Sequence, residues 1–191
     1  MKDVLTGKFV RLSAFDPQEM SKKIPHWNQN SEYFRLLNSS GQPMQSSKAA
    51  LKWMDEEAGE VSPADYYFSI RTLTEDKLIG ELSLDVVTWL GRDAFVGLGI
   101  GETEYWGKGY GTDVMNVLLR FAFTEVNLRR VTLSVFEYNP RAIRSYEKAG
   151  FRHEGRARKV LNKEGKRWDI LYMGILREEW LELNHDASRA A

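Results

Sequence analysis

The hydrophobic positions of the chain follow two different periods. Apolar and polar residues alternate, as they do along a strand, in several short stretches. We therefore expect strands at 9–12, 66–72, 78–87, 94–100, 131–135, 152–160 and 168–176, with turns at 74–77 and 162–165. Apolar residues at helical spacing, with capping residues before them, predict helices at 16–27, about 51–58, 114–122 and 140–149. Residues 29–46 are polar and irregular, and 186–191 are expected to fray.

The order of these elements predicts a mixed α/β fold. A strand, a long helix and another strand follow one another between residues 94 and 135, which implies a parallel strand pair. Hairpins join other neighbours, so most of the sheet should be antiparallel, with helices on both faces. The chain has 191 residues, 42% of them hydrophobic, which suits a single domain over 1–191. We expect an ordered core at about 7–182 and a tail at 183–191.

A glycine-spaced turn separates the strand at 94–100 from the helix after it. It reads Tyr-Trp-Gly-Lys-Gly-Tyr-Gly-Thr, from Tyr105 to Thr112. The first turn of a helix has backbone N–H groups without intrahelical acceptors, so this turn predicts a site for a phosphate or pyrophosphate. A nucleoside triphosphate loop needs Ser or Thr after its Gly-Lys pair, and a dinucleotide fingerprint needs glycine at position 112. The sequence fits neither of these two motifs.

The strand that leads into this turn is bare on one face. Gly97, Gly99 and Gly101 alternate with apolar residues, and side chains alternate between the faces of a strand. Glycine weakens a strand and is tolerated where a ligand or another backbone comes close. Coenzyme A, a long linear ligand with phosphates at one end, has a shape that suits this edge. Backbone N–H groups around Gly99 to Gly101 would polarise an acyl carbonyl. Alternatively, the glycines only ease packing of the long helix.

A second motif lies about thirty residues further along the chain. Asn139 is a helix N-cap, Pro140 stands at the first helical position, and Gly150 is a left-handed stop. Together with the glycine strand and the turn, this motif resembles the GNAT superfamily of acyl-CoA-dependent N-acetyltransferases, over roughly residues 7–180. The sequence is most similar to the branch that acetylates the N-terminal amines of ribosomal proteins. The general family pattern begins its turn with Arg or Gln, where this chain has Trp106, a departure familiar in that branch.

The resemblance implies a fold detail and a reaction. In the family, two central parallel strands splay apart and the acyl-CoA lies in the opening. The implied acyl donor is acetyl-CoA, which passes its acetyl group directly to an amine in a ternary complex. The expected cofactor-binding residues are Gly99, Ile100, Gly101, Trp106, Gly107, Lys108, Gly109, Tyr110, Gly111, Thr112, Asn139, Arg141 and Arg144.

The resemblance also implies roles for two residues of the second motif. Tyr146 matches the family's general acid near the coenzyme sulfur, and Asn139 matches a residue that contacts the pantetheine arm or the acetyl group. Helical periodicity places Tyr146 on a buried face with Ala142, Ile143 and Ala149. A core tyrosine with a satisfied hydroxyl is therefore the alternative.

Carboxylates on the strand at 78–87 are the candidates for a catalytic base. Glu81 and Asp85 share one face of the strand with Ser83. Residues four apart on a strand are roughly 13 Å apart, so the two carboxylates would act separately or bind a cationic acceptor. We expect Glu81 to be the base. The alternative is that this face of the sheet is simply exposed to solvent.

Composition and charge limit the classes of partner that we expect this protein to bind. Lys and Arg number 27, as do Asp and Glu, so the net charge gives no reason to expect nucleic acid or an anionic membrane as partner. We expect a cytoplasmic monomer or homodimer, since no long apolar segment or signal sequence is present. The chain has no cysteine, and its three histidines are far apart, so no metal is expected.

The expected function is transfer of an acetyl group to a primary amine, either a protein N-terminus or a small molecule. A polyamine, an aminoglycoside or another small amine is the alternative acceptor. A regulatory module that binds coenzyme A without catalysis is the alternative from another class. We expect residues 29–46, the strand with Glu81 and the final hairpin to select the acceptor.

Overall fold

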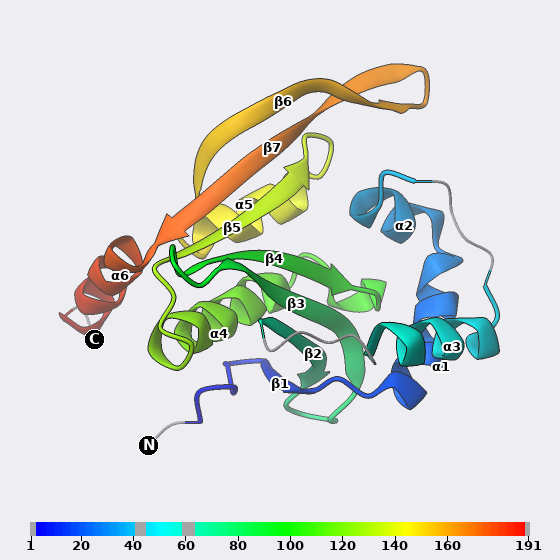
Figure 1. The fold of residues 1–191 in the computed structure, drawn as a ribbon, viewed down its shortest axis with the longest axis horizontal. Coiled ribbons are helices and arrows are strands. Elements are labelled where there is room, and N and C mark those ends of the chain that lie inside the picture. Colours follow the sequence, from blue (N-terminus) through cyan, green and yellow to red (C-terminus); the bar gives the residue numbers. More distant parts are fainter. Residues whose placement is uncertain (1–2, 41–44, 59–63, 190–191) are drawn as a thin grey trace.

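The computed structural model of this chain describes residues 3–40, 45–58 and 64–189. Seven strands form one sheet in the order β1-β2-β3-β4-β5-β7-β6 (Figure 1). Their bounds are β1 (Val10–Ala14), β2 (Asp65–Thr72), β3 (Leu78–Thr88), β4 (Asp93–Ile100), β5 (Arg130–Phe136), β6 (Arg152–Lys163) and β7 (Lys166–Leu176). Every neighbouring pair is antiparallel except β4 and β5. The expected mixed, mostly antiparallel α/β fold is confirmed.

The parallel pair holds together only at its beginning. β4 and β5 pair from Asp93 with Arg130 to Phe95 with Thr132, and then they separate. Each strand continues, β4 to Ile100 and β5 to Phe136, with its outer neighbour still paired to it. The splayed pair that the family resemblance implies is therefore present, and the opening lies in the middle of the sheet.

Two helices follow the splayed strands and carry the two sequence motifs. Helix α4 (Tyr110–Thr124) buries an apolar face, including Leu118, against Leu82, Val96 and Val131 of the sheet. Helix α5 (Pro140–Lys148) begins after Asn139, whose side chain accepts a hydrogen bond from the N–H of Ala142. Gly150 ends it with a φ of 100°, as its sequence pattern predicts.

Three helices gather at one end of the sheet, away from the C-terminal helix (Figure 1). They are α1 (Pro17–Asn28), α2 (Ser31–Leu37) and α3 (Ser47–Ala58), and they build a separate small core around Met20, Trp27 and Met54. Helix α2 corrects the expectation that 29–46 is irregular. Its N-cap Asn30 accepts hydrogen bonds from the N–H groups of Glu32 and Tyr33. Residues 41–44 lie outside the described part.

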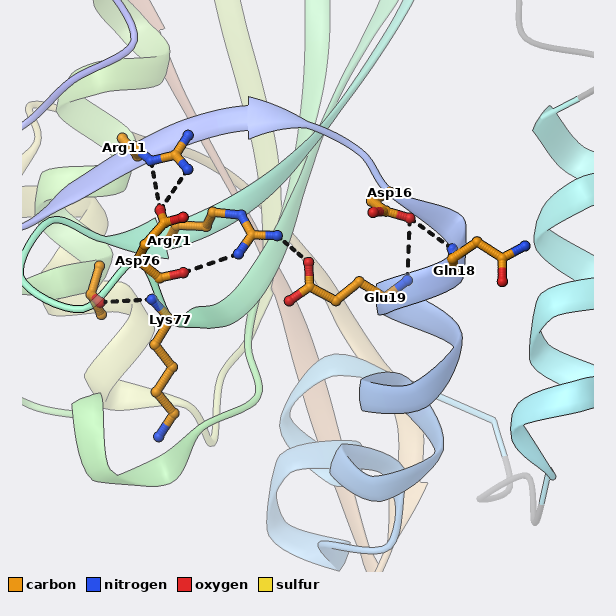
Figure 2. A network of polar contacts seen from close by, with 8 residues as sticks. Arg11, Asp16, Gln18, Glu19, Arg71, Asp76 and Lys77 are labelled. Atoms are coloured by element: carbon orange, nitrogen blue, oxygen red, sulfur yellow. Dashed lines mark hydrogen bonds and ion pairs between the residues drawn. The ribbon is translucent and has the colours of Figure 1, made fainter.

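The start of α1 is tied to the turn between β2 and β3 by a polar network (Figure 2). Asp16 caps the helix as predicted, by accepting hydrogen bonds from the N–H groups of Gln18 and Glu19. The carboxylate of Glu19 does not complete a capping box among the described residues, because it pairs with Arg71 of β2. Arg11 of β1 binds Asp76 of the turn, so three elements are joined at this edge.

The C-terminal hairpin is longer than its hydrophobic pattern indicates. Strands β6 and β7 pair up to Lys163 and Lys166, and the turn is only Glu164 and Gly165, both with positive φ. Helix α6 (Arg177–Arg189) follows, and it continues into the stretch 183–191 that the sequence assigns to a tail. Within the described residues, no helix combines the length and hydropathy needed to cross a bilayer.

A buried carboxylate holds the start of α4 against the first strand. The Asp113 side chain accepts hydrogen bonds from the backbone N–H groups of Lys8, Phe9 and Val10, at 2.7 to 3.1 Å. Gly7 must be small here, because an added Cβ would lie 2.4 Å from the Asp113 carboxylate. These bonds fix the glycine-spaced turn, whose last three residues begin α4, relative to the sheet.

Candidate active site

A cavity of about 460 Å³ occupies the opening between β4 and β5. Its walls come from both splayed strands, the glycine-spaced turn, one side of α5 and one side of α2. Among the expected site residues, those that line it are Gly99, Ile100, Trp106, Gly107, Gly109, Gly111, Thr112, Asn139, Arg141, Arg144 and Tyr146. The two sequence motifs therefore meet in one space.

The glycine-spaced turn forms one end of this cavity. The backbone N–H groups of residues 107–112 donate no hydrogen bond within the described structure, and the first helical bond runs from Asp113 to Gly109. Gly107 and Gly109 have φ values of 71° and 90°, a conformation that other residues rarely adopt. Six unpaired donors in sequence at a helix N-terminus make a ready site for an anion.

Helix α5 places cationic side chains along the same cavity. Arg141, Arg144 and Lys148 stand three and four residues apart, which is the spacing of one helix face, and all three line the cavity. The Arg141 guanidinium lies 3.9 Å from the centre of the Trp106 ring and 3.8 Å from the carboxylate of Glu32 on α2. The cavity thus offers positive charge beside unpaired backbone donors.

The edge of β4 supplies further backbone donors. Their positions change the expectation that N–H groups around Gly99 to Gly101 polarise the acyl carbonyl. The N–H of Gly101 donates to the carbonyl of Ile79 on the β3 side, so it is not free to polarise an acyl carbonyl. Backbone groups alternate in direction along an antiparallel strand, so the N–H groups of Leu98 and Ile100 point away from β3. The carbonyl of Ile100 also points that way and accepts from the Trp106 indole at 2.7 Å.

Tyr146 reaches the cavity from α5 with little exposure to solvent. Its side chain is 8% exposed and its ring packs beside Phe151. Burial raises the pKa of the hydroxyl to about 12, so Tyr146 keeps its proton throughout the neutral range. No described group accepts a hydrogen bond from that hydroxyl. Tyr146 is thus both a core residue and a hydrogen-bond donor beside the cavity.

Glu81 lies next to the cavity on the opposite face of the sheet from α4. It is directly paired with Gly99, which lines the cavity, and its side chain is partly covered. Burial raises the pKa of its carboxyl from an ordinary 4.5 to about 7. This face of β3 is therefore not simply exposed to solvent at Glu81. With a pKa of about 7, the Glu81 carboxyl can exchange a proton at neutral pH.

Four expected site residues lie outside the lining of the cavity. They are Glu81, Gly101, Lys108 and Tyr110. Gly101 leaves room for the Trp27 ring, which an added Cβ would meet at 2.0 Å. The Tyr110 ring packs between Phe9 and Tyr105, and Lys108 is exposed on the turn. Their roles in binding stay predictions.

The lining residues that the sequence argument missed include two sets on helices. Tyr33, Leu36 and Leu37 come from α2, within the stretch taken as irregular, where the Asn30 cap was the available signal. Lys148 continues the cationic face of α5, which the spacing from Arg144 would have indicated. Across the described ranges, no cluster of three His, Asp or Glu side chains is placed to hold a metal ion.

Comparison with known proteins gives a consistent result. Residues 10–152 match the model of the acetyltransferase (GNAT) domain. Over 181 residues the chain is 27% identical to the SPbeta prophage-derived uncharacterized N-acetyltransferase YokL of Bacillus subtilis, and the match covers 94% of this chain and 96% of that protein. It is 32% identical over 114 residues to the spermidine N(1)-acetyltransferase of Vibrio cholerae, covering 58% of this chain and 65% of that protein.

A solved structure shares the same fold. The crystal structure of spermidine N-acetyltransferase from Vibrio cholerae in complex with CoA and spermine superimposes with a TM-score of 0.78 at 24% identity. The match covers 90% of this chain and 98% of that one. The expected fold and the expected enzyme class, an acyltransferase, are confirmed. Since the family model matches most of its length, this chain belongs to the GNAT acetyltransferase family.

Proposed function

We propose that this protein is an acetyl-CoA-dependent N-acetyltransferase that acetylates a primary amine by direct transfer in a ternary complex. The observation that carries the proposal is the row of unpaired N–H groups at 107–112, open to the cavity between β4 and β5. A pyrophosphate at that row would direct the rest of the coenzyme along the separated edge of β4. The relative solved with CoA supports this choice of ligand.

The residues present fit the pyrophosphate, the pantetheine arm and the thioester of acetyl-CoA. The pyrophosphate would accept hydrogen bonds from the turn, and Arg141, Arg144 and Lys148 would neutralise phosphate charge from α5. The amides of the pantetheine arm would pair with the backbone of β4, where the N–H groups of Leu98 and Ile100 face the opening. The thioester would then lie near Gly99, with Glu81 beside it.

The reaction needs a neutral amine, a polarised carbonyl and a proton for the departing sulfur. Glu81 takes a proton from the acceptor ammonium, and the amine nitrogen then forms a C–N bond with the thioester carbon as the C–S bond breaks. The N–H of Ile100 is the available backbone donor for the carbonyl oxygen. The second proton lost by the nitrogen leaves with solvent, and the coenzyme departs as its thiol.

Tyr146 acts on the departing sulfur mainly as a hydrogen-bond donor. A phenol with a pKa of about 12 is a weaker acid than a thiol, whose ordinary pKa is about 8.5. Complete transfer of its proton to a thiolate is therefore uphill. A hydrogen bond from Tyr146 would stabilise the charge as it develops on sulfur, and solvent would complete the protonation.

A polyamine is the second candidate for the acceptor, and one structural observation favours it over an N-terminal amine. Asp65 of β2 faces Asp85 of β3 directly, four residues along the strand from Glu81. Burial and the charge of Asp65 raise the pKa of Asp85, although a hydrogen bond from Ser83 opposes the shift. Like charges that face each other across strands are destabilising unless a cation lies near them. The spermidine-acetylating relative agrees with this acceptor class.

The test is incubation of the protein with acetyl-CoA and a panel of amines, followed by mass spectrometry of the products. The panel contains peptides with free N-termini, the same peptides with blocked N-termini, polyamines and aminoglycosides. Acetylation of at least one primary amine is expected, with none in the blocked peptides. Acetyl-CoA binding without any product would favour the non-catalytic module, and the absence of binding would contradict the proposal.

A further inference from the structure

Tyr33 lines the cavity but has no role in the function described so far. It comes from α2, and its N–H is fixed by the cap residue Asn30 at 3.1 Å. The side chain is 4% exposed, and its ring meets the edge of Trp27. The Tyr33 side chain thus lines the cavity from the face of the sheet opposite α4, which is the face of Glu81.

The bare α-carbon of Gly99 marks the point where two polar groups converge. A Cβ atom added to Gly99 would lie 2.8 Å from the Tyr33 hydroxyl oxygen and 3.6 Å from Cγ of Glu81. The Tyr33 hydroxyl oxygen and Cγ of Glu81 are therefore no further apart than the sum of these distances. Burial and the charge of Glu81 raise the pKa of Tyr33, so the carboxylate lies within electrostatic reach of the hydroxyl. A nitrogen atom held between the two groups would make hydrogen bonds of about 2.7 to 3.2 Å. Glycine at 99 keeps this space open.

Polar groups around this point lack partners among the described residues. The Tyr33 hydroxyl and the Glu81 carboxylate form no hydrogen bond or ion pair with any described residue. Ser69 is fully buried, faces Glu81 directly across β2 and β3, and its hydroxyl oxygen also has no partner among the described groups. Leaving a buried hydroxyl such as that of Ser69 unsatisfied is costly, and such a group commonly marks a place where a ligand or water completes the bonds.

We propose that Tyr33 is a catalytic residue whose hydroxyl, together with the Glu81 carboxylate, holds the acceptor nitrogen over Gly99. This inference rests on the proposed acetyl transfer. The ammonium donates one hydrogen to the Tyr33 oxygen and one to Glu81, and the second of these is the proton that Glu81 takes. The nitrogen lone pair that is released faces the thioester held at the β4 edge. Two hydrogens of the ammonium are bound before the reaction, so the site excludes tertiary amines, which carry only one.

The position of Tyr33 depends on contacts that reach across the molecule. Arg35 of α2 pairs with Glu164 at the tip of the β6–β7 hairpin, and Tyr138 donates a hydrogen bond to the Arg35 carbonyl at 2.9 Å. Lys163 donates to the Asn38 carbonyl just after α2. The hairpin therefore holds α2, and with it the Tyr33 hydroxyl, over the thioester position.

The test compares Tyr33→Phe with the wild type and with a control, Tyr66→Phe. Tyr66 packs on Phe121 on the α4 face, away from the cavity. Because the Tyr33 hydroxyl has no hydrogen-bond partner among the described residues to lose, its removal should not lower the unfolding midpoint and should leave the acetyl-CoA affinity unchanged. The loss of one hydrogen bond to a charged ammonium predicts a fall of about 10- to 100-fold in kcat/KM for the acceptor. Tyr66→Phe should match the wild type.

A second variant tests the space itself. Gly99→Ala places a methyl group where the nitrogen is proposed to lie. It should therefore lower kcat/KM for the acceptor by a similar factor, while acetyl-CoA still binds. Acceptor binding to the CoA complex is measured by calorimetry beside turnover. If Tyr33→Phe has the kcat and the kcat/KM of the wild type, the role of Tyr33 is overturned and the proposed acetyl transfer is not. A wild type that binds acetyl-CoA but neither binds nor acetylates any amine would overturn this site and the proposed function together.

Discussion

Replacing Glu81 by glutamine should make the protein more stable and less active at the same time. Burial raises the pKa of the Glu81 carboxyl from 4.5 to about 7. The native protein then holds this proton more tightly than the unfolded chain, so the free energy of unfolding falls as the pH rises from 4.5 to 7. At 1.36 kcal/mol per pH unit, the difference corresponds to at most about 3 kcal/mol above pH 7. The glutamine side chain cannot ionise, so the Glu81→Gln variant escapes this cost.

Kinetics should show the opposite effect of the same group. A base with a pKa of about 7 is about one-tenth ionised at pH 6 and nine-tenths ionised at pH 8, so kcat/KM should rise about ninefold between them. Glu81→Gln should lower kcat/KM most at low pH, and the loss should shrink toward the pKa of the acceptor amine.

Denaturant unfolding followed from about pH 4.5 to 9, and initial rates followed from about pH 5 to 9, measure these two effects. Glu75→Gln is the matched control, since Glu75 is exposed on the turn before β3. The variant and the wild type should be equally stable near pH 4.5, and the variant more stable at about pH 8. A variant with the stability and the pH profile of the wild type would refute both the burial of the charge and the role of Glu81 as base.

Three further variants test other parts of the account. Gly109→Glu should abolish acetyl-CoA binding in calorimetry with the protein still folded, because a side chain and a like charge enter the anion site. Gly165→Glu, at a positive φ outside the cavity lining, is the control, and unchanged affinity in Gly109→Glu would exclude this turn as the site. Tyr146→Phe should lower kcat by about 10²-fold with acetyl-CoA affinity nearly unchanged, and a wild-type kcat would return Tyr146 to a packing role. Asp113→Ala should lower the free energy of unfolding by about 3 kcal/mol, because buried N–H groups lose their acceptor, and a shift under about 0.5 kcal/mol in denaturant unfolding would contradict this anchoring.

Local signals were enough to predict the parts of the site that lie in continuous stretches of chain. Asn139, Pro140 and Gly150 mark their helix because caps act on their own backbone neighbours. Gly107 and Gly109 have the positive φ that the spacing indicates. The parallel pair follows from the order of strand, helix and strand.

Long-range contacts were not predictable in the same way. Helix α2 is only seven residues long, too short to show a clear helical periodicity, and its place depends on contacts such as Arg35 with Glu164. Alternation along β3 put Glu81 on a polar face but could not show that α2 covers it. Gly101 leaves room for the Trp27 ring, a neighbour that the sequence could not name because glycine signals a close approach only; its expected role at the ligand stays a prediction.

Some expectations from composition stay predictions. They include a cytoplasmic location, a monomer or homodimer, and the absence of a nucleic-acid partner. The binding roles of Lys108 and Tyr110 belong with them.

Initial-rate kinetics with both substrates varied tests the central claim most directly. Release of the coenzyme thiol is followed while acetyl-CoA and the best amine of the panel are each taken through saturation. Direct transfer in a ternary complex predicts double-reciprocal lines that intersect, with thiol and acetylated amine formed in equal amounts. Parallel lines, which indicate an acetylated enzyme, or no amine-dependent thiol release with any acceptor, would contradict the account.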